Sequence, residues 1–456
     1  MSLTRALGRG GTTLPGRLAL ILAPQILTEL SSRLKEGILV ITGTNGKTTT
    51  TALINNILKE HRINCIHNQS GSNLSWGVAS ALIEYASWLG KLNQDCAVIE
   101  VDEGSFPGVV SNISPRGVTL TNIFRDQLDR FGEIDHIQNS LKEGLEKLPP
   151  GSFKAINADD PSLVEIKNDK QKNTVYYGLE LDLPSYPFQN SGRDIKTCPL
   201  CSKVLKYNKI YFAHLGHFYC PECHYKRPEP AIKLTGCQFT PGNSTQLEIS
   251  MPHNNITASV SLLGIYNLYN ILAAVACAHG LGIPGDIIVK ALKKTTPSFG
   301  RMEQFALGDK NITMTLIKNP VGTNEVLRTI LTREGKINLL IAINDKIADG
   351  TDVSWLWDVD FEQLLDHRNK FANIIVSGTR AWEMAVRLKY TGFTPEIIMV
   401  EEKLQDAISL ALEKSDSESR LFILPNYTAM LEMRRDLNRM GLGQPYWNQE
   451  EKYENY

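Results

Sequence analysis

Seven consecutive residues, GTNGKTT at positions 43–49, have the types and spacing needed to bind the phosphates of a nucleotide. Glycines allow backbone N–H groups to turn toward an anion, and the positive end of a following helix attracts the same charge. Lys47 can reach the outer phosphates, and the Thr48 hydroxyl can bind Mg²⁺. The pattern departs from G-x-x-x-x-G-K-[ST] at one position, because Ile41 stands where the first glycine is expected. We predict nucleotide contacts from Gly43, Thr44, Asn45, Gly46, Lys47, Thr48 and Thr49.

A carboxylate ends the apolar run 96–101, which is typical of a buried strand. Ligands of parallel sheets bind at the carboxyl ends of the strands, so Glu100 can complete a Mg²⁺ shell begun by Thr48 and the phosphates. Glu103 follows closely and is a further candidate. The alternative is a strand end capped by solvated acids. We predict Lys47 and Glu100 as catalytic residues, and Thr48 and Glu100 as magnesium ligands.

Two C-x-x-C pairs separated by about 18 residues indicate a second site, one that could bind a metal ion. Each pair can offer two sulfurs to one tetrahedral ion, and four thiolates leave no open position for a substrate. We therefore predict a structural zinc site formed by Cys198, Cys201, Cys220 and Cys223. Four free thiols, or a redox pair, are the alternatives. Three nearby histidines are superfluous to this site and are expected to be surface or hairpin residues: His214, His217 and His224.

Apolar runs alternate with helical patterns between residues 37 and about 178. Strands are predicted at 38–42, 65–67, 96–101, 118–122 and 154–157. Helices are predicted between them at 48–61, 76–89, 134–148 and 161–167. Continuous apolar strands that alternate with helices indicate a parallel sheet covered by helices on both faces.

The last third of the chain repeats this pattern. Strands are predicted at 312–317, 337–343, 372–377, 396–400 and 420–424. Helices are predicted at 324–333, 361–366, 379–389, 404–414 and 427–438. The fold class is therefore α/β, with a second, Rossmann-like doubly wound sheet.

Changes in composition indicate the domain limits. Residues 1–36 are expected to form a helical segment packed on the central domain; a signal peptide is the alternative, because arginines precede a short apolar run. Residues 37–300 are expected to form the central ATP-binding domain, interrupted at about 190–230 by the cysteine pairs. Residues 301–456 are expected to form the C-terminal α/β domain.

Bulk composition excludes several classes of protein. The 456 residues are 42% hydrophobic and 21% charged, which is typical of a globular chain. The net charge of −1 gives no global field toward nucleic acid or anionic lipid. No apolar run approaches the roughly 20 residues of a membrane helix. A nucleotide-using protein with free thiols is expected in the reducing cytoplasm.

The motifs together resemble those of the Mur ligase family, the ATP-dependent amide ligases of cell-wall precursor assembly. The loop at 43–49 is similar to that family's phosphate loop, which tolerates the missing first glycine, and Glu100 matches its magnesium-binding glutamate. The helix 264–274 resembles the family's G-x-x-N-x-x-N-x-x-A-A pattern, which implies that Asn267 faces the nucleotide base. Gly300-Arg-Met-Glu303 resembles G-R-x-E, which implies that Arg301 contacts ATP.

Two departures from that family lie beside the site. Thr121-Asn-Ile matches the start of T-N-x-x-x-D-H, but Gln127 stands where the histidine is expected, so a second metal cannot be held in the usual way. Asp126 or Asp129 could lie near the metal. Lys142 is one position away from the lysine that many Mur ligases carry in carbamylated form, so carbamylation stays open.

The cysteine pairs narrow the resemblance to the branch of the family that amidates lipid II. It implies a subunit that uses ATP to activate the α-carboxylate of D-glutamate in the stem peptide as an acyl phosphate, at the cytoplasmic face of the membrane. A class I glutamine amidotransferase subunit of the GatD type would supply ammonia, which gives D-isoglutamine, and a heterodimer is expected. The implied cofactors are ATP, Mg²⁺ and structural Zn²⁺.

The C-terminal region adds an acidic loop at 344–358. Asp349 or Asp352 could order the partner's catalytic histidine; alternatively, these acids line the ATP site or only face solvent. Three other functions are weighed against the amidoligase. One is a ligase that adds an amino acid, of the folylpolyglutamate type. The others are a zinc-ribbon NTPase that binds nucleic acid and a degenerate ligase that serves as a scaffold.

Overall fold

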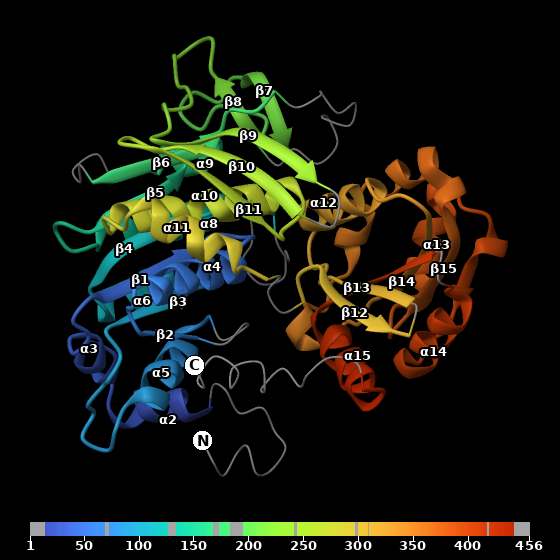
Figure 1. The fold of residues 1–456 in the computed structure, drawn as a ribbon, viewed down its shortest axis with the longest axis horizontal. Helices are drawn as coiled ribbons and strands as arrows, with labels where there is room; N and C mark the ends of the chain where they lie inside the picture. The colour runs from blue at the N-terminus through green and yellow to red at the C-terminus, as the bar shows by residue number, and fades with distance from the viewer. Residues whose placement is uncertain are drawn as a thin grey trace. The chain divides into compact units, whose positions relative to one another are not determined.

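The computed structural model describes residues 14–68, 73–125, 134–166, 173–182, 195–240, 244–296, 300–308, 310–416 and 419–441 (Figure 1). The chain forms two compact units. Unit 1 comprises residues 1–124, 133–189 and 193–296. Unit 2 comprises residues 125–132, 190–192 and 297–456.

Unit 1 is built on a sheet that has nine strands in the described residues, in the order β11-β10-β9-β6-β5-β4-β1-β3-β2. The strands are β1 (Gly37–Thr42), β2 (Cys65–His67), β3 (Cys96–Glu100), β4 (Pro115–Leu120), β5 (Phe153–Asn157), β6 (Thr174–Leu179), β9 (Ile232–Thr240), β10 (Ser244–Ser250) and β11 (Asn255–Val260). The strands from β2 to β9 in this order are parallel, and β10 and β11 extend the sheet antiparallel.

In the described residues, the helices of unit 1 either connect these strands or precede and follow them in the chain. They are α2 (Leu14–Leu22), α3 (Ile26–Ser31), α4 (Lys47–Glu60), α5 (Ser75–Tyr85), α6 (Phe106–Asn112), α8 (Ile134–Glu146), α9 (Pro161–Glu165), α10 (Ile265–Gly280) and α11 (Gly285–Lys293). Helices α10 and α11 both contact α4, so the helix that follows the phosphate loop is packed against two others (Figure 1). Helix α2 packs on α5 through Gly16, whose N–H donates to Ser80 Oγ at 2.8 Å.

Strand register brings the predicted site residues to one edge of the sheet. Strand β1 lies between β3 and β4, and Ile41 is paired with Glu100 on one side and Thr119 on the other. All three strands are parallel, so their carboxyl ends meet there. The residues that follow them, namely the phosphate loop and the segment 121–124, are therefore neighbours in space.

The segment between β6 and β9, which we call the cysteine insertion, carries a small antiparallel hairpin. Its strands are β7 (Lys206–Phe212) and β8 (Leu215–Tyr219). Four buried residues of the insertion form a small core with Val164 of α9, namely Cys198, Leu205, Phe218 and Cys220. So few apolar residues give the insertion little stability of its own, and a bound metal is the usual remedy.

Unit 2 has a six-stranded sheet in the described residues, in the order β12-β13-β17-β14-β15-β16. Its strands are β12 (Glu303–Leu307), β13 (Lys310–Met314), β14 (Lys336–Ala342), β15 (Phe371–Ser377), β16 (Ile398–Val400) and β17 (Ser419–Pro425). Its helices are α12 (Pro320–Leu331), α13 (Ala381–Thr391), α14 (Leu404–Lys414) and α15 (Tyr427–Arg439), with 3₁₀ turns η1 (Ile347–Asp349), η2 (Ser354–Trp357), η3 (Phe361–Lys370) and η4 (Pro395–Ile397). Among the described strands of unit 2, β12 alone is antiparallel to its neighbour.

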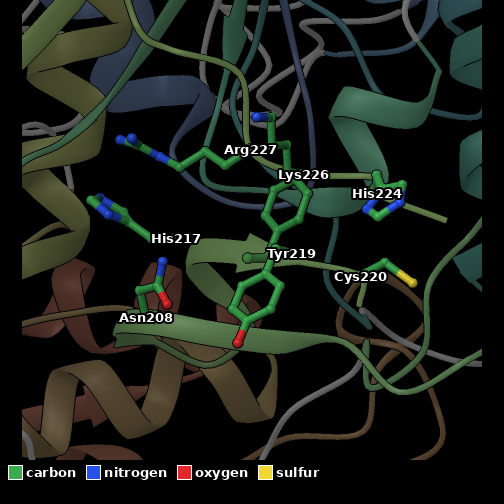
Figure 2. A pocket seen from close by; sticks show the side chains of 8 residues that line it. Asn208, His217, Tyr219, Cys220, His224, Lys226 and Arg227 are labelled. Carbon is green, nitrogen blue, oxygen red and sulfur yellow. The ribbon is translucent and has the colours of Figure 1, made fainter. Parts of the chain in front are cut away.

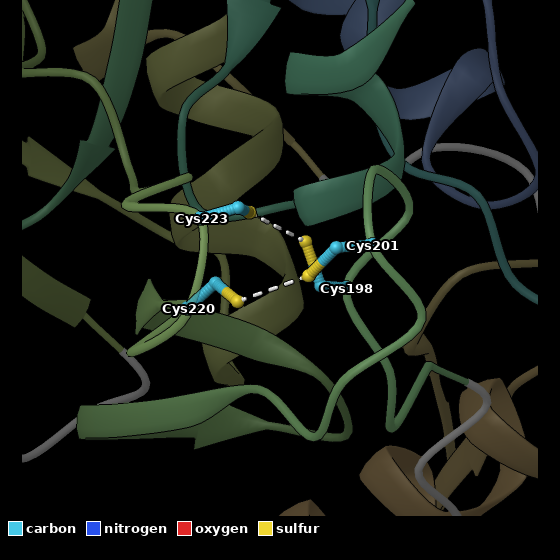
Figure 3. Close-up of side chains that lie close together, drawn as sticks. All are labelled: Cys198, Cys201, Cys220 and Cys223. Carbon is cyan, nitrogen blue, oxygen red and sulfur yellow. Dashed lines mark hydrogen bonds between the residues drawn. The ribbon is translucent and has the colours of Figure 1, made fainter.

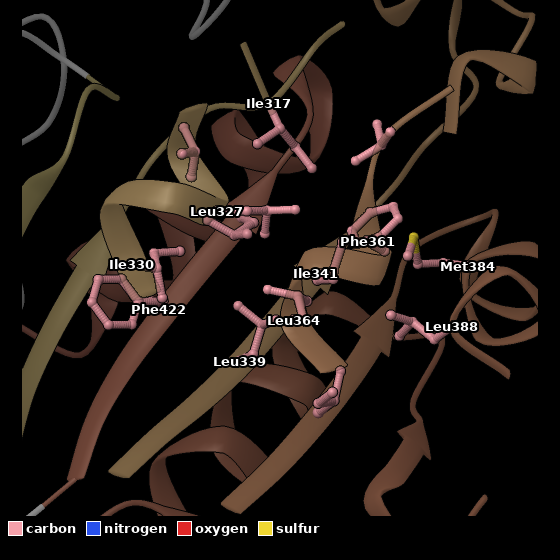
Figure 4. Close-up of a cluster of buried hydrophobic side chains, with 14 of the residues drawn as sticks. Ile317, Leu327, Ile330, Leu339, Ile341, Phe361, Leu364, Met384, Leu388 and Phe422 are labelled. Carbon is pink, nitrogen blue, oxygen red and sulfur yellow. The ribbon is translucent and has the colours of Figure 1, made fainter. Parts of the chain in front are cut away.

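Branched aliphatic and aromatic side chains fill one face of this second sheet. Leu339 and Ile341 of β14 and Phe422 of β17 meet Leu327 of α12 and Phe361 of η3, all nearly inaccessible to solvent (Figure 4). The parallel strands bury both faces, which explains their continuous apolar sequence.

The α/β fold class predicted from the sequence is confirmed, with two sheets that are mainly parallel. The helix predicted at 76–89 is wrong at its end, because α5 stops at Tyr85 and Ala86 is extended with ψ of 134°. Helix α6 was not predicted; it is short, with Pro107 in its first turn. The predicted helix at 361–366 is a 3₁₀ turn.

Candidate functional site

The loop at 43–46 has the backbone shape of a phosphate cradle. Gly43 and Gly46 adopt φ values of +122° and +90°, which strain any residue with a Cβ. There is also no room for one, because a Cβ on Gly43 would lie 2.3 Å from Thr121 Oγ1 and one on Gly46 would lie 2.1 Å from Asn270 Oδ1. Helix α4 then begins at Lys47, so its first N–H groups are available to an anion.

Lys47 is held directly over this loop. Its ammonium donates to Gly43 O at 2.5 Å and to Glu103 Oε2 at 3.0 Å, and the residue is only 7% exposed. Burial lowers the pKa of Lys47, but the attraction of Glu103, Asp102 and Glu100 outweighs it, so that the pKa lies above its usual value. The lysine therefore carries a full positive charge at neutral pH.

Thr48 and Glu100 are brought together as predicted for a magnesium pair. The Thr48 hydroxyl donates to Glu100 Oε2 at 2.8 Å. The side-chain amide of Asn68 donates to Glu100 O and its Oδ1 accepts from Glu100 N, both at 2.8 Å, which fixes the end of β3. A hydroxyl and a carboxylate oxygen beside a phosphate cradle are ligands that suit Mg²⁺, which prefers oxygen.

The segment 121–124 clamps the phosphate loop from its other side. Asn122 O accepts from Thr44 N at 2.8 Å, and Asn122 Oδ1 accepts from Asn45 N at 2.9 Å. Phe124 N donates to Thr44 Oγ1 at 3.0 Å. The side chain of Asn122 thus helps to fix the shape of the loop. Asp126, Gln127 and Asp129 lie outside the described residues.

Helix α10 supplies two asparagines. Asn267 is buried; its amide donates to Leu263 O at 2.7 Å, and its Oδ1 accepts from Asn270 at 3.1 Å. Asn270, to which the sequence interpretation gave no role, is the one that lies against Gly46. Its spacing of three residues from Asn267, on the same helix face, is the signal that could have identified it.

Two further acids were missed by the sequence interpretation. Asp159 and Asp160 follow β5, and neither is accessible to solvent. Asp159 Oδ2 accepts from Tyr269 OH of α10 at 2.7 Å, and Asp160 Oδ2 accepts from Ile123 N at 2.8 Å. Their signal is two acids at the carboxyl end of an apolar strand, the same signal that identified Glu100.

The four cysteines converge as the spacing predicts (Figure 3). Their sulfurs all lie within 4.8 Å of one another, with Cys198 Sγ and Cys223 Sγ 3.5 Å apart and Cys201 Sγ and Cys220 Sγ also 3.5 Å apart. Four thiols at these separations can surround one ion. Hydrogen bonds from backbone N–H groups lower the pKa of Cys220 to about 7, whereas burial raises the pKa of Cys198. The cluster fits Zn²⁺ held as a closed structural site.

Comparison with known proteins identifies the family. Residues 41–196 match the model of the Mur ligase middle domain, and residues 316–430 match that of the MurT ligase C-terminal region. The chain is 37% identical over 430 residues to the lipid II isoglutaminyl synthase (glutamine-hydrolyzing) subunit MurT of Streptococcus pneumoniae, which covers 94% of this chain and 92% of that protein. The chain belongs to the MurT family.

Two more comparisons agree with this assignment. The MurT subunit of Staphylococcus aureus strain COL is 35% identical over 436 residues, with 96% of this chain and 95% of that protein covered. A solved structure of a pseudomurein peptide ligase type C from Methanothermus fervidus superposes with a TM-score of 0.70 at 25% identity, over 90% of this chain and 80% of that one. The resemblance to Mur ligases drawn from the motifs is confirmed.

The match to the MurT C-terminal model includes the acidic loop of unit 2. Asp349 is 3% exposed, and its two carboxylate oxygens accept from the backbone N–H and the hydroxyl of Thr428 at the start of α15. Burial raises the pKa of Asp349. Asp352 is exposed and accepts from Ser354 N at 2.8 Å.

Two other predicted residues of this MurT-family chain are placed as follows. Arg301 is half-buried in unit 2, and its guanidinium donates to Gly300 O at 3.4 Å. Lys142 of α8 has a side chain that is 52% exposed and lies 3.9 Å from Glu165. Its carbamylation stays open.

A cavity of about 610 Å³ lies on the cysteine insertion, lined in part by His217, Lys226 and Arg227 (Figure 2). Its basic lining does not by itself indicate an anion site. Arg227 is paired with Asp159 at 2.5 Å and with Glu180 at 2.7 Å. His217 Nε2 lies 2.9 Å from Leu179 O. We therefore interpret these contacts as the attachment of the insertion to the sheet.

Proposed function

We propose that this chain is the ATP-dependent ligase subunit of a lipid II isoglutaminyl synthase. One observation carries the proposal. In a chain of the MurT family, a charged Lys47 over a glycine loop and a Thr48–Glu100 oxygen pair meet at one sheet edge. That arrangement suits the transfer of a phosphoryl group.

The chemistry follows from the weakness of a carboxylate as an electrophile. Transfer of the γ-phosphoryl group of ATP to the α-carboxylate of D-glutamate in the lipid II stem peptide gives ADP and an acyl phosphate. Neutral ammonia attacks the acyl carbon, phosphate leaves, and the nitrogen loses a proton to give the amide of D-isoglutamine. The first backbone N–H groups of α4 and the ammonium of Lys47 would offset the charge on the phosphoryl oxygens.

We further propose roles for the remaining residues of the nucleotide site. Thr48 and Glu100 would hold Mg²⁺, which supplies charge neutralisation when bound. Asn267 would contact the base, and Arg301 would contact ATP. Cys198, Cys201, Cys220 and Cys223 would hold Zn²⁺ in a structural role.

The function is tested by co-expression with a class I glutamine amidotransferase subunit, followed by mass spectrometry of lipid II incubated with ATP and glutamine. The second stem residue should change from carboxylate to amide, and omission of ATP should prevent it. Addition of an amino acid instead of ammonia would contradict the proposal, as would amidation without ATP.

An exposed apolar stripe on unit 2 supports the proposal of a GatD-type partner in a heterodimer. Trp382, Val386 and Tyr390 follow one another at every fourth residue of α13 and are 61%, 43% and 75% exposed. Trp357, 54% exposed, extends the stripe, with its ring centroid 5.8 Å from that of Tyr390. Exposed aromatic residues at helical spacing are typical of binding surfaces.

Replacing both Trp382 and Tyr390 by alanine should weaken binding of the amidotransferase subunit at least about tenfold, because aromatic residues dominate such interfaces. Affinity would be measured by calorimetry between the separately purified subunits. Trp88→Ala is the matched control, since this tryptophan is fully exposed in unit 1. Unchanged affinity in the double variant, or an equal loss in the control, would rule out this surface.

Asp349 and Asp352 are proposed to act on the partner's glutaminase site. The loop that carries them is tied to the start of α13, because Asp345 accepts from Thr379 Oγ1 at 2.7 Å and from Arg380 Nε at 2.9 Å. Asp349→Asn and Asp352→Asn should be compared for glutamine hydrolysis and, with added ammonia, for amidation. If the aspartate orders the partner's histidine, its replacement should abolish glutamine hydrolysis but leave amidation with added ammonia unchanged. Unchanged glutamine hydrolysis in both variants would contradict a role of these aspartates in the partner's glutaminase site.

No helix in the described part of the chain combines the length and apolar character needed to cross a membrane. We propose that the chain acts at the cytoplasmic face, where ATP and lipid-linked precursors meet. Fractionation of cells that express the tagged chain tests this location. We expect the chain in the cytoplasm or bound to the inner face of the membrane, and recovery from the extracellular medium would contradict the proposal.

A further inference from the structure

The turn of the β7–β8 hairpin places a histidine in the interior of unit 1. His214 follows Ala213, which has a φ of +47°, and is wholly inaccessible to solvent. It lies in the hairpin, as expected, but the alternative of a surface position is wrong. Neither ring nitrogen has a hydrogen-bond partner among the described residues. Burial of an unsatisfied polar group costs free energy, so this position needs an explanation.

His214 contacts the segment that clamps the phosphate loop. Its ring centroid lies 4.8 Å from that of Phe124, and its Nε2 lies 3.6 Å from Asp160 Oδ1. Asp160 holds Ile123 N through its other oxygen. Phe124 in turn donates to Thr44 Oγ1. A short series of contacts therefore runs from the hairpin turn to the phosphate loop.

The same insertion contacts helix α10. Arg227 Nε donates to Asp159 Oδ1 at 2.5 Å, and Asp159 Oδ2 accepts from Tyr269 OH of α10 at 2.7 Å. Phe212, at the end of β7, lies 5.6 Å from Phe124 and 5.6 Å from Tyr269 between ring centroids. Tyr269 is next to Asn270, which lies against Gly46.

We propose that the cysteine insertion braces the nucleotide site, so that metal loading and nucleotide affinity are coupled. His214 acts as a positioning residue for the segment 121–124, and Arg227 acts in the same way for α10. The inference rests on the proposed nucleotide site. The metal is needed because the insertion's own core is small and includes two of the four cysteines.

Thermodynamic linkage makes this coupling reciprocal. If Zn²⁺ orders the hairpin and thereby tightens nucleotide binding, a bound nucleotide must raise Zn²⁺ affinity by the same factor. A coupling of about tenfold is typical of such linked sites. A purely local structural role for the metal predicts no effect of nucleotide on Zn²⁺ affinity.

The test uses the full chain loaded with Zn²⁺ and a non-hydrolysable ATP analogue with Mg²⁺. Calorimetry gives the nucleotide Kd before and after removal of Zn²⁺ by a zinc-selective chelator, and competition with the chelator gives Zn²⁺ affinity with and without nucleotide. Both ratios should be about tenfold and equal. If the loaded chain binds nucleotide but either ratio is one, the inference is overturned and the proposed function stands. If the Zn²⁺-loaded chain binds no nucleotide, the inference and the proposed function are both contradicted.

Chelation could unfold the insertion, so His214→Ala provides a test that leaves the metal in place. This variant keeps all four cysteines. It should retain one Zn²⁺ per chain and an unchanged circular dichroism spectrum, while the nucleotide Kd rises about fivefold or more. Lys206→Ala is the control, because Lys206 is an exposed residue at the start of the same hairpin, in β7. An unchanged Kd in His214→Ala, or an equal rise in the control, would overturn the inference.

Discussion

Replacing Lys47 by alanine should lower ATP-dependent amidation of lipid II by about 10³-fold, while the chain still folds and still binds its amidotransferase partner. Lys47 is the cation over the phosphate loop, 2.5 Å from Gly43 O, and nearby carboxylates keep it protonated. Without it, the backbone N–H groups alone face the outer phosphates. Amidation would be measured by mass spectrometry of lipid II, and assembly by co-purification.

Lys91→Ala is the matched control, because Lys91 is an exposed lysine in unit 1 outside the site. It should amidate at the rate of the unmodified chain. Full activity of Lys47→Ala would remove the phosphate loop from the mechanism. Loss of amidation with assembly retained would reject a scaffold that merely supports its partner.

Asp159→Asn should lower the free energy of unfolding by about 3 kcal/mol or more, the usual result of removing one partner from a buried ion pair. Asp159 is inaccessible to solvent, and the Arg227 side chain is 8% exposed. Burial lowers the pKa of Arg227, but Asp159 and Glu180 raise it above its usual value, so the guanidinium stays charged in both proteins. The asparagine keeps the shape but leaves that charge without one of its counter-ions. Thermal unfolding of the full chain measures the loss.

Two further variants show whether the buried charge is the cause. Asp159→Asn combined with Arg227→Met should recover part of the loss, because the uncompensated charge has gone. Asp182→Asn breaks an exposed pair with Lys209 of the same insertion, in which Asp182 is 93% exposed, and should leave the midpoint unchanged. Equal destabilisation by Asp182→Asn and Asp159→Asn would contradict the argument.

The parts of the site that could be predicted from sequence are those encoded locally. GTNGKTT after an apolar strand specifies both a turn and a helix start, so Lys47 and Thr48 follow directly from it. Glu100 was found because a strand end places it at the ligand edge of a parallel sheet. The cysteines were found because metal geometry restricts their spacing.

The parts that were missed depend on packing between distant segments. Asp159 accepts a hydrogen bond from Tyr269, which is 110 residues away in sequence. Asp160 accepts one from Ile123, which is 37 residues away. His214 was interpreted as a surface or hairpin residue because nothing local shows that a hairpin turn is buried. Tertiary contacts of this kind leave no periodic pattern in the sequence, so only the fold reveals them.

The register of β1 with its neighbours has a consequence for which changes the chain can tolerate. Because Ile41 is opposite both Glu100 and Thr119, the site depends on the number of residues in β3 and β4 as well as on their identity. Side chains alternate between faces, so the loss of a single residue inside β3 would turn Glu100 away from Thr48. Exchange of one buried aliphatic residue for another would leave it in place. These strands are therefore constrained in length more strictly than in composition.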